Sequence, residues 1–105
     1  GELRITQMVN DGDLLLQSDD GLGGTATYLG LDGSTQQVVF HSESLHKDNV
    51  KAKFGADGDL RIYHNGSHSF IQDTGTGDLR LLSSKIRLQD TSENTKLETP
   101  MTELK

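Results

Sequence analysis

The chain has 105 residues, of which 31% are apolar, 12 are glycine and none is cysteine, and its formal net charge is −6. The acidic balance and the singly scattered lysines and arginines argue against nucleic acid or an anionic membrane as a partner. The lack of cysteine excludes disulfides and thiolate metal sites. The longest apolar runs have three residues, as in Leu14 to Leu16, which is too short for a membrane-spanning helix or a signal-peptide core.

The predicted elements are short β-strands, because apolar residues recur at every second position and no window of twelve residues keeps a helical spacing. Turn-forming clusters at 19–24, 31–35, 55–58 and 73–77 separate the strands. The alternating residues are, in chain order, Leu3 and Ile5; Leu14 and Leu16; Thr25, Thr27, Leu29 and Leu31; Val38 and Phe40; Val50, Ala52 and Phe54; Leu60 and Ile62; Leu79 and Leu81; and Ile86 and Leu88. The sequence therefore predicts an all-β fold.

One local pattern, glycine-acid-leucine-any-aliphatic, occurs four times. It reads GELRI at 1–5, GDLLL at 12–16, GDLRI at 58–62 and GDLRL at 77–81. The spacing is irregular, so we interpret the pattern as a repeated strand-starting turn rather than a solenoid repeat.

The dipeptide Asn65-Gly66 between two alternating runs predicts a β-hairpin. A two-residue loop there would pair Tyr63 with His68, Ile62 with Ser69, Arg61 with Phe70, and Leu60 with Ile71. One face then carries Leu60, Ile62 and Ile71, and the other carries Tyr63, His68 and Phe70. Since a lone hairpin is marginal in water, we expect it to pack against further β structure.

A second hairpin, turning at Ser83-Ser84, would align Leu81 with Ile86 and Leu79 with Leu88. It would also place Arg80 opposite Arg87, which is unfavourable. Either the register differs, or these strands pair with other strands, which would fit an intertwined oligomer. We expect residues 1–98 to form one β-rich segment and 99–105, which contain Pro100, to form a loosely ordered tail. Because it begins with Gly1, we expect the chain to be part of a longer protein.

The stretch FGADGDLRIYHNGSHSFIQDTGTGDLRL, residues 54–81, resembles a segment common in tail-fibre and related structural proteins of marine bacteriophages. The preceding residues 18–40 and the later TKLET resemble the neighbouring text of those proteins, so the resemblance covers roughly residues 12–99. It implies a fibrous homotrimer in the virion, outside the cell, built as a triple-stranded β-helix or β-prism and joined to other tail-fibre segments. It implies a shaft element without catalytic residues. The final PMTELK departs from the pattern.

The low apolar content also predicts a core shared between chains, because 31% is little for a domain of this length. The residues expected to face this trimer core are Leu60, Ile62, Leu79, Leu81, Ile86 and Leu88.

Three groups of residues are candidates for a metal or catalytic site. His64 and His68 flank the expected turn on opposite faces, and His41 and His46 are distant in sequence; an axial metal could still use one histidine set per chain. The acidic loops at 10–14, 18–24 and 55–60 could offer carboxylates to calcium, although aspartate and glycine are also the best turn formers. Ser42 and His46 lack a nucleophile-elbow context. We expect neither enzymatic activity nor a cofactor.

The main functional hypothesis is thus a rigid trimeric tail-fibre shaft that supports attachment to a host receptor. The alternative is a carbohydrate-binding module that recognises a host surface glycan, with Tyr63, His68 and Phe70 as the contacts. A third interpretation is a designed or chimeric chain that contains the shaft segment, which only the final PMTELK suggests.

Overall fold

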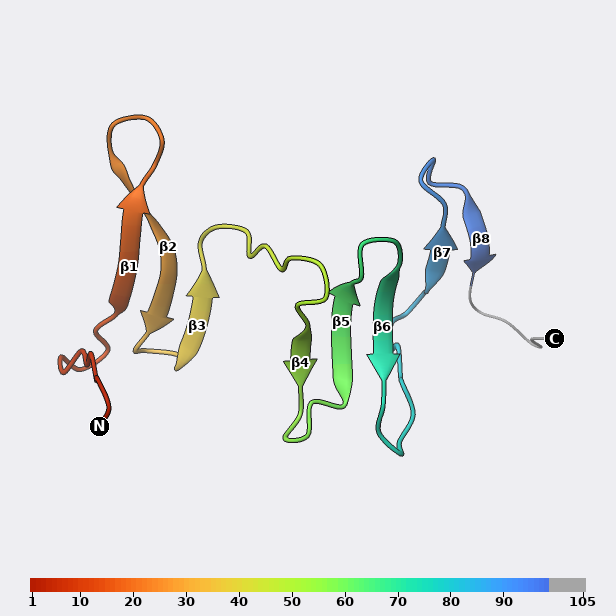
Figure 1. Cartoon of the computed structure of the whole chain (residues 1–105), viewed down its shortest axis with the longest axis horizontal. Coiled ribbons are helices and arrows are strands. Elements are labelled where there is room, and N and C mark those ends of the chain that lie inside the picture. The colour runs from red at the N-terminus through yellow and green to blue at the C-terminus, as the bar shows by residue number, and fades with distance from the viewer. Residues whose placement is uncertain (99–105) are drawn as a thin grey trace. The chain divides into compact units, whose positions relative to one another are not determined.

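The computed structural model describes residues 1–98, which form eight strands and no helix (Figure 1). The strands are β1 (Leu14–Asp19), β2 (Thr25–Asp32), β3 (Gln37–Phe40), β4 (Ala52–Phe54), β5 (Leu60–His64), β6 (Ser69–Asp73), β7 (Arg87–Gln89) and β8 (Thr95–Glu98). They make three antiparallel sheets, with strand orders β1-β2-β3, β4-β5-β6 and β7-β8. The all-β prediction is confirmed. The expected tail at 99–105 lies outside the described residues.

The chain divides into two units, residues 1–47 and 48–105. The first unit contains the sheet β1-β2-β3, in which Leu14 pairs with Leu31 and Leu16 with Leu29. A β-bulge at Tyr28 then shifts the register, so that Thr27 pairs with Gln17. The expected continuous series from Thr25 to Leu31 is therefore wrong: the bulge moves the threonines off the face that carries the leucines. The Tyr28 hydroxyl donates to the carbonyl of Asp19 at 2.6 Å and holds the bulge in place.

In the second unit, the expected Asn65-Gly66 hairpin forms between β5 and β6, but its register differs by two residues from the prediction. Tyr63 pairs with Phe70 and Ile62 with Ile71. The reason is the Asn65 side chain, whose Oδ1 accepts the N–H groups of Ser67 (2.9 Å) and His68 (2.7 Å). Asn65 thereby remains the last paired residue, and the chain reverses one residue later, with φ of 97° at Gly66. A two-residue shift preserves the faces.

The hairpin expected at Ser83-Ser84 does not form in the chain. Residues 79–82 are not in a strand, and β7 pairs instead with β8, which places Arg87 opposite Glu98 and Leu88 opposite Leu97. The observed pairing avoids the two opposed arginines of the expected register, which would be unfavourable. Of the two segments, β7 thus pairs with a different strand of the same chain, whereas residues 79–82 lie in no strand among the described residues.

No apolar side chain among residues 1–98 is buried; the buried residues in that range are Gly30 and Gly58. The cause is the architecture, since each described sheet is a single layer and nothing within its unit covers its faces fully. A folded chain normally buries most of its large apolar residues. Residues 1–98 also contain no helix long and apolar enough to cross a bilayer.

Candidate functional site: open apolar faces and acidic loops

The sheet β1-β2-β3 carries six apolar side chains on one face. The register places them in two rows across the three strands. This surface, which we call the first apolar face, comprises Leu14, Leu31 and Val38 in one row and Leu16, Leu29 and Phe40 in the other. Phe40 is 64% exposed and Val38 58%. Three paired strands thus present a continuous apolar surface that is largely exposed.

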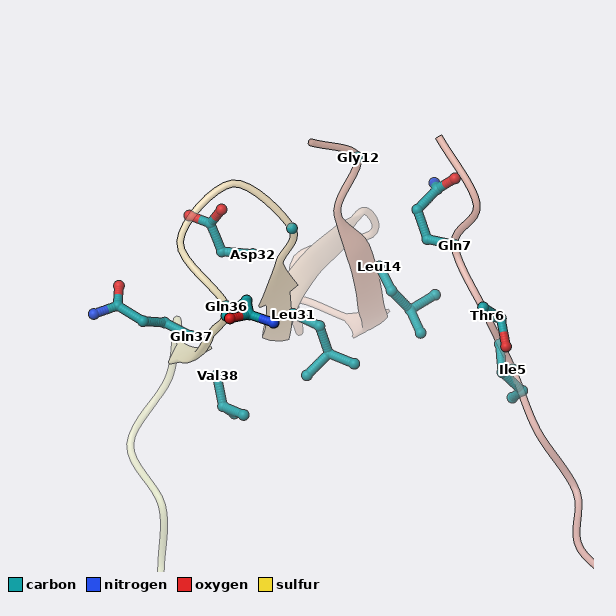
Figure 2. Close-up of a pocket in the computed structure, with 11 residues that line it drawn as sticks. Ile5, Thr6, Gln7, Gly12, Leu14, Leu31, Asp32, Gln36, Gln37 and Val38 are labelled. Atoms are coloured by element: carbon teal, nitrogen blue, oxygen red, sulfur yellow. The ribbon is translucent and has the colours of Figure 1, made fainter. Parts of the chain in front are cut away.

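The N-terminal segment covers only one end of the first apolar face. Figure 2 shows Leu14, Leu31 and Val38 pointing to the same side of the sheet, with Ile5 and Gln7 across from them. The cleft between them has a volume of about 350 Å³. Gln7 anchors the segment, because its Nε2 donates to the carbonyl of Asp13 at 3.2 Å and its Oε1 accepts the N–H of Val9 at 3.0 Å. The cleft is therefore the partly covered end of a larger open surface.

The sheet β4-β5-β6 has a second apolar face. Ala52, Ile62 and Ile71 lie side by side on it, and Phe54 pairs with Leu60 in the next row. Ile71 is 62% exposed and Phe54 52%. This face is the one that the sequence assigned to Leu60, Ile62 and Ile71, so the two-residue shift leaves the expected composition intact.

The opposite face of this sheet carries the aromatic residues. The rings of Tyr63 and Phe70 stack with centroids 4.9 Å apart and planes at 21°, and His68 meets Phe70 edge-on at 6.4 Å. The ammonium group of Lys51 lies 4.7 Å from the centre of the Tyr63 ring. Because Phe70 covers one side of the Tyr63 ring and Lys51 the other, the ring of Tyr63 offers little area to a ligand. The three expected glycan contacts do lie together.

The six residues expected in a trimer core occupy different environments. Leu60 and Ile62 lie in β5 and Leu88 in β7, while Ile86 immediately precedes β7. Leu79 and Leu81 lie outside any strand and are 47% and 60% exposed. The expectation omitted the first apolar face entirely. Its signal was present in the alternation of residues 14–16, 29–31 and 38–40, but only the strand register shows that these three runs share one face.

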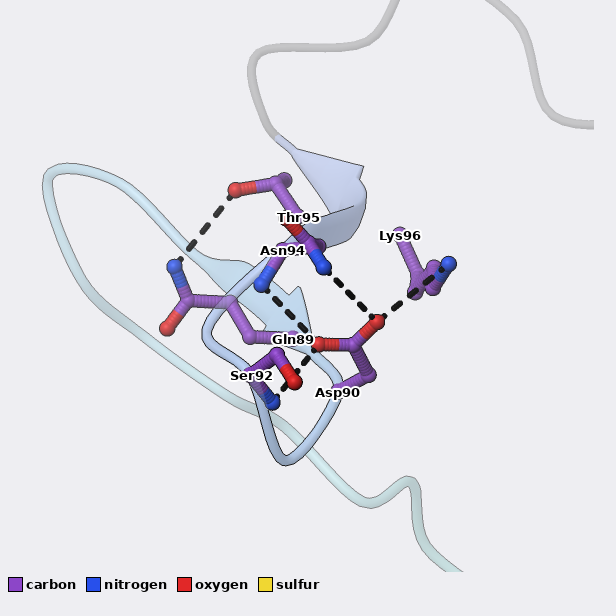
Figure 3. Close-up of polar contacts among 6 residues, drawn as sticks. All are labelled: Gln89, Asp90, Ser92, Asn94, Thr95 and Lys96. Carbon is purple, nitrogen blue, oxygen red and sulfur yellow. Dashed lines mark hydrogen bonds and ion pairs between the residues drawn. The ribbon is translucent and has the colours of Figure 1, made fainter.

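Two hairpins are closed by acidic loops of the same conformation at their aspartates. In the loop between β1 and β2, Oδ1 of Asp20 accepts the N–H groups of Leu22 (2.7 Å) and Gly24 (3.0 Å). Between β7 and β8, Oδ1 of Asp90 accepts the N–H groups of Ser92 (2.9 Å) and Asn94 (3.0 Å), as Figure 3 shows. These carboxylates therefore satisfy their own loops, which supports the turn-forming interpretation of the aspartates at these positions.

Hydrogen bonding to the charged form lowers the pKa of three loop carboxyls. The pKa of Asp20 lies below its ordinary value mainly because of the Leu22 N–H, that of Asp90 because of the Asn94 N–H, and that of Asp32 because of the Ser34 hydroxyl. Each carboxylate then stabilises the folded loops above the unfolded pKa of about 4. This contribution is lost as the pH falls through the folded pKa values, which lie lower still.

We predict that replacing Asp20, Asp32 and Asp90 together by asparagine weakens the acid sensitivity of the fold. Asparagine retains an acceptor oxygen at the same position but does not titrate. The thermal unfolding midpoint of the triple variant should fall less between about pH 4 and pH 2 than that of the unmodified chain. Circular dichroism at pH 7, 4 and 2 measures this. An equal loss in both proteins would mean that other carboxyls dominate the acid response.

Glu93 holds a left-handed backbone conformation, with φ of 64°, at the fourth position of the Asp90 loop. Gly23 occupies the same position of the Asp20 loop, with φ of 91°. Glu93→Gly should therefore raise stability by about 0.5 kcal/mol, because the relief of left-handed strain exceeds the entropy cost of glycine. Thr91→Gly in the same loop is the matched control and should lower stability by a similar amount. Thermal unfolding of both variants checks the sign; a loss for Glu93→Gly would contradict the strain argument.

The histidines are not brought together. His64 Nδ1 lies 2.9 Å from the Ser69 hydroxyl, while His68 packs on Phe70. His41 lies beside Gly30, and its backbone N–H donates to the carbonyl of Tyr28. Among residues 1–98, no three His, Asp or Glu side chains are grouped closely enough to hold a metal ion. An axial metal would take one histidine from each of several chains, so it belongs to the proposed assembly. Ser42 and His46 lie in the exposed connection between β3 and β4.

No protein-family model matches the chain, and comparison with curated proteins and with solved structures gives no significant match.

Proposed function

We propose that the chain is a structural segment of a bacteriophage tail fibre and assembles with two further copies into an intertwined homotrimeric shaft. The phage setting comes from the resemblance of residues 54–81 to tail-fibre segments. The observation that carries the assembly is that every described apolar side chain is at least partly exposed, while both three-stranded sheets present an apolar face. In a homotrimeric fibre, the surfaces available to cover these faces are those of identical chains.

The exposure of both apolar faces supports an interface between copies. Val38 and Phe40 on the first apolar face are 58% and 64% exposed, and Phe54 and Ile71 on the second are 52% and 62% exposed. Packing these faces against those of other copies would remove their apolar surface from water.

The proposed mechanism is mechanical. Apolar faces from three chains bury one another and form a shared core, so the folded state and the oligomer become inseparable. Short strands and hydrogen-bonded acidic loops would let the chain change direction at each corner without long flexible connections. The resulting rod would hold a receptor-binding tip away from the virion. No residue in this account acts on a substrate.

The test is the molar mass in solution, measured by size-exclusion chromatography with light scattering across a dilution series. We predict a mass three times that of the 11.5 kDa chain, without dissociation until the chains also unfold. A folded monomer that persists at every concentration would contradict the proposal.

A second candidate, a carbohydrate-binding module, is favoured by the aromatic cluster of Tyr63, His68 and Phe70. Aromatic rings on a surface often contact sugars, but a binding site also needs a groove with fixed polar partners. Glycan-array binding that is lost in Tyr63→Ala, while the molar mass is unchanged, would support this function. Absence of binding by the unmodified chain would leave the cluster with a packing role.

A further inference from the structure

Residues 77–81 and 58–62 have nearly the same sequence, GDLRL and GDLRI, but different structures. In the earlier copy, Leu60 to Ile62 lie in β5, between β4 and β6. The later copy pairs with no strand among residues 1–98, and Leu81 and Leu82 are 60% and 84% exposed. Because local strand propensity is the same, the difference lies in the presence or absence of neighbouring strands. The later copy has the sequence of a strand without a partner.

We propose that residues 78–82 form a strand that pairs with the outer edge of β6 in a second copy of the chain. The inference rests on the proposed homotrimer and names the contact between its chains. An added strand makes main-chain hydrogen bonds to the edge strand, and its alternate side chains lie on the two faces of the sheet and give the contact its specificity. Leu79 and Leu81 extend the second apolar face beyond Ile71, and Asp78 and Arg80 point to the other side.

The two edges of the sheet β4-β5-β6 differ in how well they are protected. β4 has only three residues, and Lys51 and Lys53 lie along it, which are two features that discourage strand addition. β6 has five residues and carries no charge from Ser69 to Gln72. Its Ile71 is 62% exposed. The outer edge of β6 is therefore the one open to an added strand.

The chain's own segment does not pair with this edge among the described residues. The N–H and hydroxyl of Thr74 both donate to the carbonyl of Asp59, at 2.8 Å and 3.2 Å. The N–H of Gly75 donates to Oδ1 of Asp73 at 2.8 Å. Thr74 is thus held against Asp59, just before β5, and does not continue along the outer edge of β6. A second copy can supply residues 78–82 without breaking these bonds.

Single cysteines test the contact, since the chain has none of its own. A tagged Gln72→Cys chain is co-refolded with an untagged Arg80→Cys or Asp78→Cys chain and oxidised. In the proposed pairing, residues 72, 78 and 80 lie on the face opposite the second apolar face. One of the two combinations therefore comes within disulfide distance in either neighbouring register. We expect a mixed disulfide at twice the 11.5 kDa chain mass. Ser92→Cys, in the exposed Asp90 loop, is the control partner and should give none.

Hydrogen exchange of the unmodified oligomer is the second measurement. Amides within residues 79–81 should exchange more slowly than that of Leu45, which is 87% exposed in the connection between β3 and β4. A trimeric mass with fast exchange at 79–81 and no mixed disulfide would overturn the inference and leave the proposed function standing. A Q72C/R80C double variant that forms only an intrachain disulfide would also overturn the inference. A monomeric mass would overturn both the strand-addition inference and the proposed function, so the two failures are distinguishable.

Discussion

Replacing Leu31 by lysine is expected to dissociate the proposed trimer. Leu31 lies in the central strand of the first apolar face, paired with Leu14 and Val38. Loss of its burial removes about 2 kcal/mol per chain, hence roughly 6 kcal/mol per trimer. A charge placed in the apolar interface adds a further desolvation cost. Light scattering of the Leu31→Lys variant should give the mass of a single chain, or unfolded and aggregated material.

Leu15→Lys is the matched control for this variant. Leu15 belongs to the same sheet, is 47% exposed where Leu31 is 44%, and lies on the opposite face. The lysine introduced at position 15 would lie on the same side of β1 as Asp13, so the new charge would face an opposite charge. The control should keep the trimeric mass. If both variants dissociate, the loss of the trimer does not depend on which face carries the lysine. If neither dissociates, the first apolar face is not an interface.

Local patterns predicted most of the strands, because alternation and turn chemistry act over a few residues. Val38 and Phe40 alternate and form β3, and Leu60 and Ile62 begin β5. β8 was missed because TKLE contains a single apolar residue, Leu97, which pairs with Leu88 of β7. Strand identity could thus be predicted where a strand carries its own apolar series.

Register and faces were harder to predict, because they depend on single hydrogen bonds. Alternation alone could not reveal that the Tyr28 hydroxyl would hold a bulge and turn Thr25 and Thr27 away from the leucines. Nor could the Asn65-Gly66 rule anticipate that Asn65 would accept two N–H groups and stay within the ladder. The hairpin faces survived this error only because the shift was an even number of residues.

The candidate surfaces likewise differ in whether local patterns or strand register determine them. The second apolar face could be predicted because one hairpin supplies Ile62 and Ile71. The first requires three strands to align, and the bulge at Tyr28 decides which residues join it. The repeat at 77–81 predicted a further strand pair, but residues 79–82 lie in no strand among residues 1–98. Strand propensity acts locally, whereas pairing needs a neighbouring strand that the pattern of one segment does not specify.

Gly33→Ala is expected to be the most damaging small substitution in the first unit. A Cβ at Gly33 would collide with the backbone carbonyl of Gly12, which no side-chain rearrangement can relieve. The turn between β2 and β3 would have to move away from the start of β1 and give up the 3.0 Å bond from the Gly33 N–H to Oδ1 of Asp13. Overpacking of this kind costs about 1–3 kcal/mol.

Gly77→Ala is the control for this substitution, because a Cβ there meets no atom within 4 Å and the residue has no positive φ. It should be neutral or slightly stabilising, since alanine restricts the unfolded chain. Thermal unfolding of both variants decides the matter. A large loss for Gly33→Ala with none for Gly77→Ala would show that contact between the β2–β3 turn and the start of β1 holds the first apolar face together. Equal midpoints would mean that the turn can move without disturbing that face, and the close approach of Gly33 to Gly12 would then carry no structural role.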